Sequence, residues 1–279
     1  MTLTKRQYAM PLTSPPTFLS THPIGKLLLT ILSCTVFFYP YGTHANNNKA
    51  DDHKLFNGRY HAVFEIRDNT LHSKYTPDDR TRKLGVAGWE RIKMLFPLAY
   101  REGIIQFNVM AGRRWAGQFS GDGENDIGRK GYRLSIAKYL LEKENNLTQA
   151  NRPVTPRRST LDWTLVHEMG HYICLTRNAI ELFSQSFDGD MVKQPIRRKR
   201  PLDYPADGAP STNGNFVTSY AERSGGDEEA VETFTTYMTI KELPTNNSLA
   251  ARKIRFFNTI DGFPELRKRI QSLSAPPST

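Results

Sequence analysis

Two histidines four residues apart, with a glutamate directly after the first, are the residues of this chain whose spacing points most clearly to chemistry. They lie in the stretch TLVHEMGHYI, residues 164–173. On an α-helix, residues i and i+4 share a face, so His167 and His171 can direct both imidazoles at one ion. Glu168 turns off that face toward the open position of a zinc site, where a general base is needed. The pattern predicts one Zn²⁺ ion held by the two histidines, with Glu168 as the base.

A catalytic zinc site needs a third protein ligand. The metzincin motif is excluded, because Cys174 and Arg177 stand where it has glycine and histidine. The later stretch SGGDEEAVETFTTYM, residues 224–238, predicts a helix whose Glu228 and Glu232 share one face. One of these carboxylates can bind the ion while the other accepts the free N–H of a ligating histidine. We therefore assign Glu228 as the third ligand and Glu232 as the acceptor.

The neighbours of Glu228 have other predicted roles. Asp227 is expected to cap the helix N-terminus, and Glu229 is expected to project into solvent beside Thr233. Glu229 remains the alternative third ligand. Three residues at helical spacing form the expected core stripe of this helix: Ala230, Phe234 and Tyr237.

TLVHEMGHYI followed by TSYAERSGGDEEAVETF resembles the zincin peptidases of the gluzincin type, in particular the catalytic domain of anthrax lethal factor and its bacterial relatives. The resemblance covers roughly residues 159–240. It implies an α+β, zincin-like fold: a small, mostly antiparallel sheet packed on the active-site helix, then a helical C-terminal subdomain. It also implies Glu228 as third ligand and a role for Tyr220 in the transition state. Ordinary core packing is the alternative for Tyr220.

The resemblance further implies zinc-dependent hydrolysis of a protein or peptide substrate, held as an added strand along residues 132–139. This sequence departs from the family pattern at Val231 and by one extra residue at Gly225 and Gly226. Two alternatives share the same motif. One is a zinc amidase that acts on cell-wall peptides, and the other is a non-catalytic envelope-binding protein with a structural zinc ion.

Hydrophobic periodicity predicts where strands and helices lie. Expected strands cover residues 59–67, 103–109, 113–119 and 132–139. Expected helices cover residues 86–96, a segment that starts near Ser159 or Thr160, and residues 227–241, 248–260 and 263–273. The turn at 121–128 carries three acids, but Arg133 stands where a calcium loop needs glutamate, which favours a hairpin.

The first 45 residues read as an export signal. Basic residues precede the apolar run LLLTILSCTVFF, and the small residues Thr43 and Ala45 follow it, as at a signal-peptide cleavage site. Cleavage after Ala45 is expected, with lipidation at Cys34 or an uncut anchor as alternatives. Residues 46–58 are polar and expected to be flexible, and residues 59–279 form the predicted peptidase domain. A periplasmic or secreted location follows.

The net charge is +10, and it falls to about +7 without the first 45 residues. This excess favours contact with an anionic envelope surface. The cluster Arg197–Arg200 lacks interleaved aromatic residues, so no specific nucleic-acid binding is expected. It lies in residues 188–215, a long stretch predicted to be functional or disordered. Cys174 is expected to be a buried apolar residue, and the oligomeric state is left open.

Overall fold

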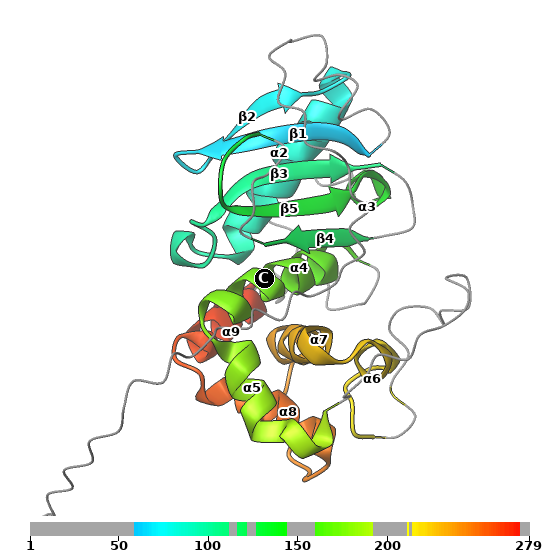
Figure 1. Ribbon diagram of the computed structural model, residues 1–279, viewed down its shortest axis with the longest axis vertical. Coiled ribbons are helices and arrows are strands. Elements are labelled where there is room, and N and C mark those ends of the chain that lie inside the picture. The colour runs from blue at the N-terminus through cyan, green and yellow to red at the C-terminus, as the bar shows by residue number, and fades with distance from the viewer. Residues whose placement is uncertain are drawn as a thin grey trace, which may run out of the picture. The chain divides into compact units, whose positions relative to one another are not determined.

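The computed structural model describes residues 59–111, 116–121, 127–143, 160–191, 211 and 214–273 (Figure 1). These residues belong to a compact unit that comprises residues 47–279. Several predictions lie wholly or mainly outside the described residues: the export signal with Cys34 and Ala45, the flexible segment 46–58, the acidic turn at 122–126 and the basic cluster Arg197–Arg200.

The strands form one five-stranded sheet in the order β2-β1-β3-β5-β4. Their bounds are β1 Tyr60–Arg67, β2 Thr70–Tyr75, β3 Ile104–Met110, β4 Gly117–Ser120 and β5 Tyr132–Ala137. β3 and β5 run parallel, whereas the other three neighbouring pairs are antiparallel. The sheet is therefore mixed, and its combination with the helices confirms the predicted α+β class.

β1 and β2 form a hairpin that the sequence analysis did not predict. Asp68 and Asn69 connect them with φ values of 47° and 62°, the left-handed conformation that two-residue hairpin turns require and that these residue types tolerate. β2 has no buried residue. A strand without a buried face shows no alternation of apolar and polar residues, which explains why the pattern missed it.

Helix α2, Asp79–Leu95, packs against the sheet and begins seven residues before the predicted start. Asp78 caps it and accepts a hydrogen bond from the backbone N–H of Thr81 at 2.6 Å. Trp89 and Ile92 are buried, whereas Val86 of the same helix is 37% exposed.

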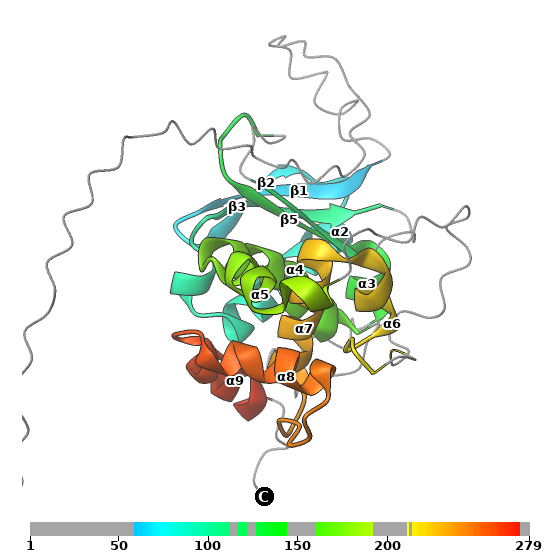
Figure 2. The same cartoon turned by 60° about the horizontal axis from the view of Figure 1, so that its bottom comes forward.

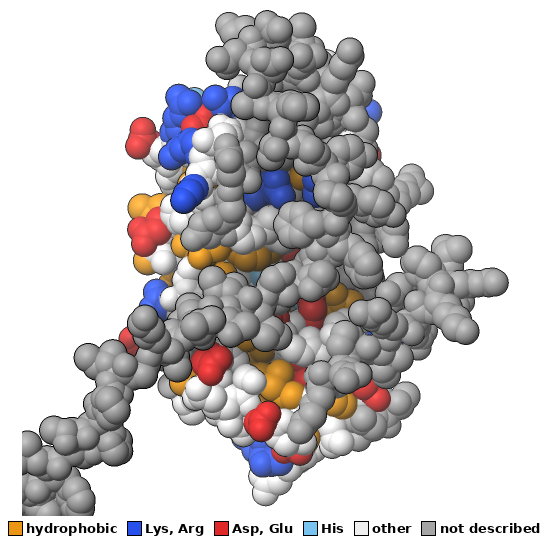
Figure 3. Space-filling model, in the orientation of Figure 1, with side chains coloured by type: hydrophobic (Ala, Val, Ile, Leu, Met, Phe, Trp, Pro, Cys, Tyr) orange, Lys and Arg blue, Asp and Glu red, His pale blue; other side chains and the backbone are white. Residues whose placement is uncertain are grey.

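The outer surface near the β1–β2 hairpin is basic, and Figure 3 shows Lys and Arg side chains gathered over the upper end of the sheet. Glu65 of β1 is almost fully buried among three cations, Arg67, Lys74 and Arg129. Hydrogen bonding from Arg67 first, and then from Lys74 and Arg129, outweighs burial and lowers the pKa of Glu65 well below its usual value.

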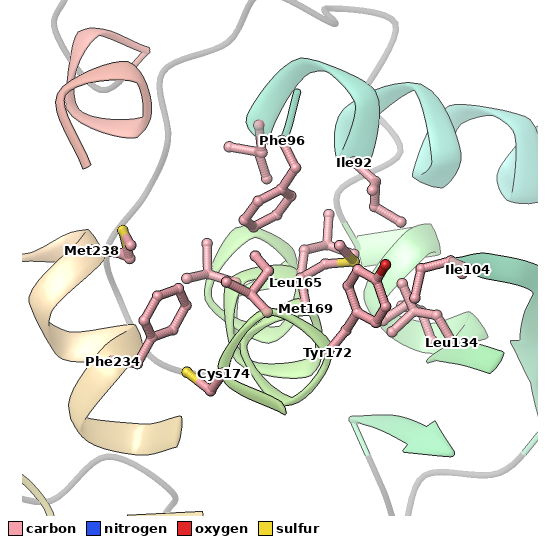
Figure 4. Packing of buried hydrophobic residues seen from close by; sticks show 14 of the residues in the cluster. Ile92, Phe96, Ile104, Leu134, Leu165, Met169, Tyr172, Cys174, Phe234 and Met238 are labelled. Atoms are coloured by element: carbon pink, nitrogen blue, oxygen red, sulfur yellow. The ribbon is translucent and has the colours of Figure 1, made fainter. Parts of the chain in front are cut away.

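Helix α4, Leu161–Thr176, lies between the sheet and the C-terminal helices (Figures 1 and 2). It starts as predicted, because Thr160 accepts a hydrogen bond from the backbone N–H of Trp163 at 3.3 Å. Leu165 and Met169 are fully buried, and Figure 4 shows α4 packed between Phe234 of α7 and the sheet. Cys174 is also fully buried and free, as predicted.

The remaining helices follow α4, apart from the short η1 (Leu98–Tyr100) and α3 (Lys138–Lys143). They are α5 Ala179–Phe187, η2 Asp188–Asp190, α6 Ser219–Ser224, α7 Gly226–Thr239, α8 Leu249–Phe256, η4 Phe257–Thr259 and α9 Phe263–Ser272. The last three predicted helical segments match α7, α8 with η4, and α9. The sequence analysis missed α5 and α6. No helix among the described residues is long and apolar enough to span a membrane.

Candidate metal centre

The two histidines of α4 face the same side of the helix. Their ring centroids lie 5.0 Å apart at an interplanar angle of 82°. Their side chains are 12% and 17% exposed, so both are largely but not fully buried. The i, i+4 spacing and the capped, mostly buried helix produce this arrangement.

Helix α7 brings Glu228 to both imidazoles. Glu228 Oε2 lies 3.3 Å from Nε2 of His167 and 3.6 Å from Nε2 of His171. Gly170 permits this approach of the two helices, because a Cβ atom there would lie 2.9 Å from Phe234 and 3.2 Å from Val231. The structure thus brings together the three residues that the sequence analysis assigned as ligands.

These three side chains fit a metal ion. Their ligand atoms all lie within 4.8 Å of one another. Two imidazole nitrogens and one carboxylate oxygen form the donor set of catalytic zinc sites, which keep a fourth position open. His167, His171 and Glu228 therefore form a group that could hold a metal ion.

Protonation of this group depends on the carboxylates around it. Burial lowers the pKa of His167, but hydrogen bonds to Glu228 and Glu232 outweigh burial and raise that pKa well above its usual value. Burial raises the pKa of Glu228, but His171 and His167 outweigh burial and hold it well below its usual value. A proton on the histidine thus compensates the carboxylate, and a bound cation would displace that proton.

Glu229, the alternative ligand, points elsewhere. Its side chain is fully buried, and its Oε1 lies 2.6 Å from Nζ of Lys253 on α8. The prediction that Glu229 is solvated was wrong, because Lys253 provides a buried charged partner that the sequence pattern does not reveal. The predicted N-cap was also wrong. Gly225, not Asp227, precedes the first turn of α7, and no side chain caps it.

Glu232 lies one turn after Glu228 and contacts the other nitrogen of His167. Its Oε1 is 3.2 Å from Nδ1 of His167, and its Oε2 accepts a hydrogen bond from the Thr218 hydroxyl at 3.2 Å. The Thr218 hydroxyl also accepts from the backbone N–H of Ala221 and so caps α6. The sequence analysis missed Thr218. Its position one residue before the Ser-Tyr pair, with an N-cap residue type, was the available signal.

Glu168 lies against the edge strand β4 and is 7% exposed. Burial is the largest cause of its raised pKa, although both histidines and the backbone N–H of Phe119 act in the opposite direction. A Cβ atom on Gly117 would lie 2.6 Å from Cγ and Oε1 of Glu168. Gly117, which the sequence analysis missed, therefore leaves the space that Glu168 occupies.

The strand beside the metal group is β4 rather than β5. Phe119 of β4 stacks on His171 with ring centroids 6.0 Å apart and an interplanar angle of 2°. β5 is paired on both sides, with β3 and β4. The expectation that residues 132–139 accept a substrate strand was therefore wrong, since a strand can be added only at a free edge.

The ring of Tyr220 of α6 lies beside that of His167, with ring centroids 6.2 Å apart and an interplanar angle of 66°. Burial, and then the nearby negative charge of Glu228, raise the pKa of its hydroxyl far above its usual value. The hydroxyl therefore stays protonated and remains a hydrogen-bond donor at neutral pH.

Comparison of the chain with protein-family models, with curated proteins and with solved structures finds no match.

Proposed function

We propose that this chain is a zinc-dependent metallopeptidase of the zincin type, with His167, His171 and Glu228 as ligands. The observation that carries the proposal is the convergence of these side chains beside Glu168, a carboxylate that is only 7% exposed. A structural zinc site would need a fourth protein ligand and no adjacent base. The open three-residue donor set therefore supports catalysis over a purely structural ion.

The chemistry divides between the ion and the chain. His167, His171 and Glu228 would hold the ion, which when bound would lower the pKa of a coordinated water to about 7 and polarise a carbonyl group. Glu168 accepts a proton from the attacking water and delivers it to the leaving amine.

Tyr220 is proposed to stabilise the oxyanion. Its protonated hydroxyl is available as a donor on the His167 side of the group, and a donor aimed at developing negative charge stabilises the transition state more than the substrate. Glu232, whose Oε1 lies 3.2 Å from Nδ1 of His167, is proposed to orient that imidazole so that Nε2 is left for the ion.

A peptide substrate fits the edge of β4. The backbone N–H of Ala137 donates to the carbonyl of Ala116 at 2.9 Å, so Ala116 bonds to β5. Backbone groups alternate in direction along an antiparallel strand. Gly117 and Phe119 consequently direct theirs to the side of β4 that is unpaired among the described residues, where the Phe119 N–H meets Glu168. An extended peptide that pairs there would cross the metal group, which favours a peptidase over a wall amidase.

We further propose that the enzyme is exported, from the pattern of residues 1–45.

The test is cleavage of casein by purified protein, with and without a zinc chelator, beside Glu168→Gln. We expect chelation to abolish cleavage and zinc to restore it. Glu168→Gln should keep fold and zinc but lose about 10²–10⁴-fold in rate, the usual contribution of a general base. Glu265→Gln, an exposed acid on α9, is the matched control and should cleave like the wild type. Wild-type protein that binds zinc but cleaves neither casein nor peptides would contradict the proposal.

A further inference from the structure

Helix α7 begins with three consecutive acids, residues 227–229, of which Glu228 meets the histidines. Neighbouring residues on a helix differ by about 100° in direction. Glu228 and Glu229 carry the same functional group, so a rotation of the first turn by one position would exchange them. The structure must therefore contain something that fixes this rotation.

The N-terminus of α7 does not fix it. Gly225 supplies no side-chain cap, and both Gly225 and Gly226 have positive φ, at 67° and 54°. Glycine at these positions allows the chain to enter the helix from a sharp turn. The first turn consequently lacks the side-chain hydrogen bond that fixes the start of α4 or α6.

The Glu229–Lys253 ion pair does fix it. Both side chains are fully buried, and the two charged atoms lie 2.6 Å apart. A buried carboxylate needs a partner of opposite charge, and Lys253 on α8 is that partner. Rotation of α7 toward Glu229 as ligand would separate this pair inside the core.

Lys253 is itself held by two other segments. Its Nζ donates to the backbone carbonyl of Asp190 at 2.8 Å and lies 4.6 Å from the ring centroid of Phe216. These residues precede and follow residues 192–210 in the chain. The ammonium therefore contacts α7 and two separate segments, which leaves it little freedom to follow Glu229 if α7 turned.

We propose that Lys253 is a positioning residue that selects Glu228, rather than Glu229, as the metal ligand. This inference rests on the proposed metal site. Without Lys253, Glu229 would be buried without its ammonium partner, and α7 would turn or fray to bring it toward the cation site or solvent. Glu228 would then leave its place beside His167 and His171.

The experiment measures the Kd for zinc of the folded protein by competition with a chromogenic chelator. For Lys253→Met we expect a Kd raised about 10–100-fold, the usual effect of losing a residue that supports a metal ligand. For Lys253→Met with Glu229→Met we expect a Kd within about threefold of wild type, because an apolar pair replaces the ion pair and leaves no competing carboxylate.

Arg91→Met is the matched control, because it breaks a different buried ion pair, with Asp162 of α4. We expect lower stability but an unchanged Kd for zinc. If Lys253→Met does not fold, Lys253→Gln replaces it, since its amide can still donate to Glu229, and the same direction of change is expected.

An unchanged Kd in the Lys253 variant, or an equal rise in Arg91→Met, would overturn the inference while the metal site stands. Failure of the double variant to recover zinc affinity would overturn it too. Wild-type protein that binds no zinc would instead overturn the proposed function itself.

Discussion

The molecule contains two kinds of charged cluster, buried ion pairs and the candidate metal centre, which differ in the distances between their charged groups and in their exposure. Arg91 and Asp162 form two contacts of 2.7 and 2.8 Å, and Lys253 and Glu229 one of 2.6 Å, with all four side chains at most 2% exposed. At the candidate metal centre, Glu228 lies 3.3 and 3.6 Å from the two imidazoles, and its side chain is 34% exposed.

The difference follows from which groups provide the partners. In the ion pairs, each carboxylate meets a cationic side chain at hydrogen-bond distance. At the metal centre, all three ligands project from two helices whose spacing is set by the contact of Gly170 with Phe234 and Val231. In each ion pair, the cation and the carboxylate balance each other's charge. The three ligand side chains are instead held around a position that a metal cation could occupy.

Breaking a closed pair should have the largest effect on folding. Arg91→Met leaves Asp162 buried without its guanidinium, and we expect the free energy of unfolding to fall by about 3–5 kcal/mol. The Kd for zinc of the folded fraction should not change, because Asp162 lies more than a turn before His167. Urea unfolding and zinc titration check this. A weakened zinc site would mean that the two kinds of group are not independent.

Removing a ligand should have the opposite effects, with a large loss of zinc affinity and a smaller loss of stability. Glu228→Ala should weaken zinc binding by more than the roughly 100-fold that limits the effect of supporting residues. Stability without metal should fall less than in Arg91→Met, because the Glu228 side chain is 34% exposed whereas that of Asp162 is fully buried. Zinc content after dialysis and urea unfolding of the metal-free protein are the measurements. Stoichiometric zinc in this variant would remove Glu228 from the site.

A supporting residue should give an intermediate effect. Glu232→Gln keeps the shape of the side chain but replaces a charged acceptor of the His167 Nδ1–H by a neutral one. We expect zinc affinity to fall about 10–100-fold. Thr218→Val, which removes only the hydroxyl that donates to Glu232, should cause a smaller loss in the same direction. A larger loss in the valine variant would show that Thr218 acts through α6 instead.

The sequence predicted best what local spacing determines. The start of α4 at Thr160 and the buried stripe Ala230, Phe234 and Tyr237 were confirmed, because caps and helical periodicity depend on neighbours within a few turns. β2, α5 and α6 were missed. β2 lacks a buried face, and α6 is too short to show a period, so their positions depend on tertiary contacts.

The candidate site shows the same division. The proximity of His167, His171 and Glu228 was anticipated from i, i+4 spacing and from the resemblance, and the structure brings them together. Glu229 was misplaced because its partner is on another helix, and a helical face does not reveal which residue will pack against it. Gly117 was not predicted for the same reason, since its role, which is to leave space for Glu168, depends on the packing of β4 on α4.

The smallest change in stability is expected at Glu65, because its carboxylate is buried but its three cationic partners are not. The Glu65 side chain is 3% exposed, whereas those of Arg67, Lys74 and Arg129 are 53%, 40% and 48% exposed. Exposed partners contribute only about 0–1 kcal/mol each. Arg67→Gln should therefore change stability within that range, far less than Arg91→Met.

The pH dependence isolates the contribution of Glu65. Arg67, followed by Lys74 and Arg129, holds its folded-state pKa below the ordinary value of 4.5. A lowered carboxylate pKa stabilises the fold above that ordinary value, and this stabilisation is lost as the pH falls toward the folded-state pKa. The stability advantage of wild type over Glu65→Gln, measured by urea unfolding, should therefore be full at pH 7 and shrink below pH 4.5. An advantage that stays constant down to pH 3 would show that Glu65 stabilises the fold through its shape rather than its charge. Glu65 would then not act as an ion-pair partner, unlike Asp162 and Glu229.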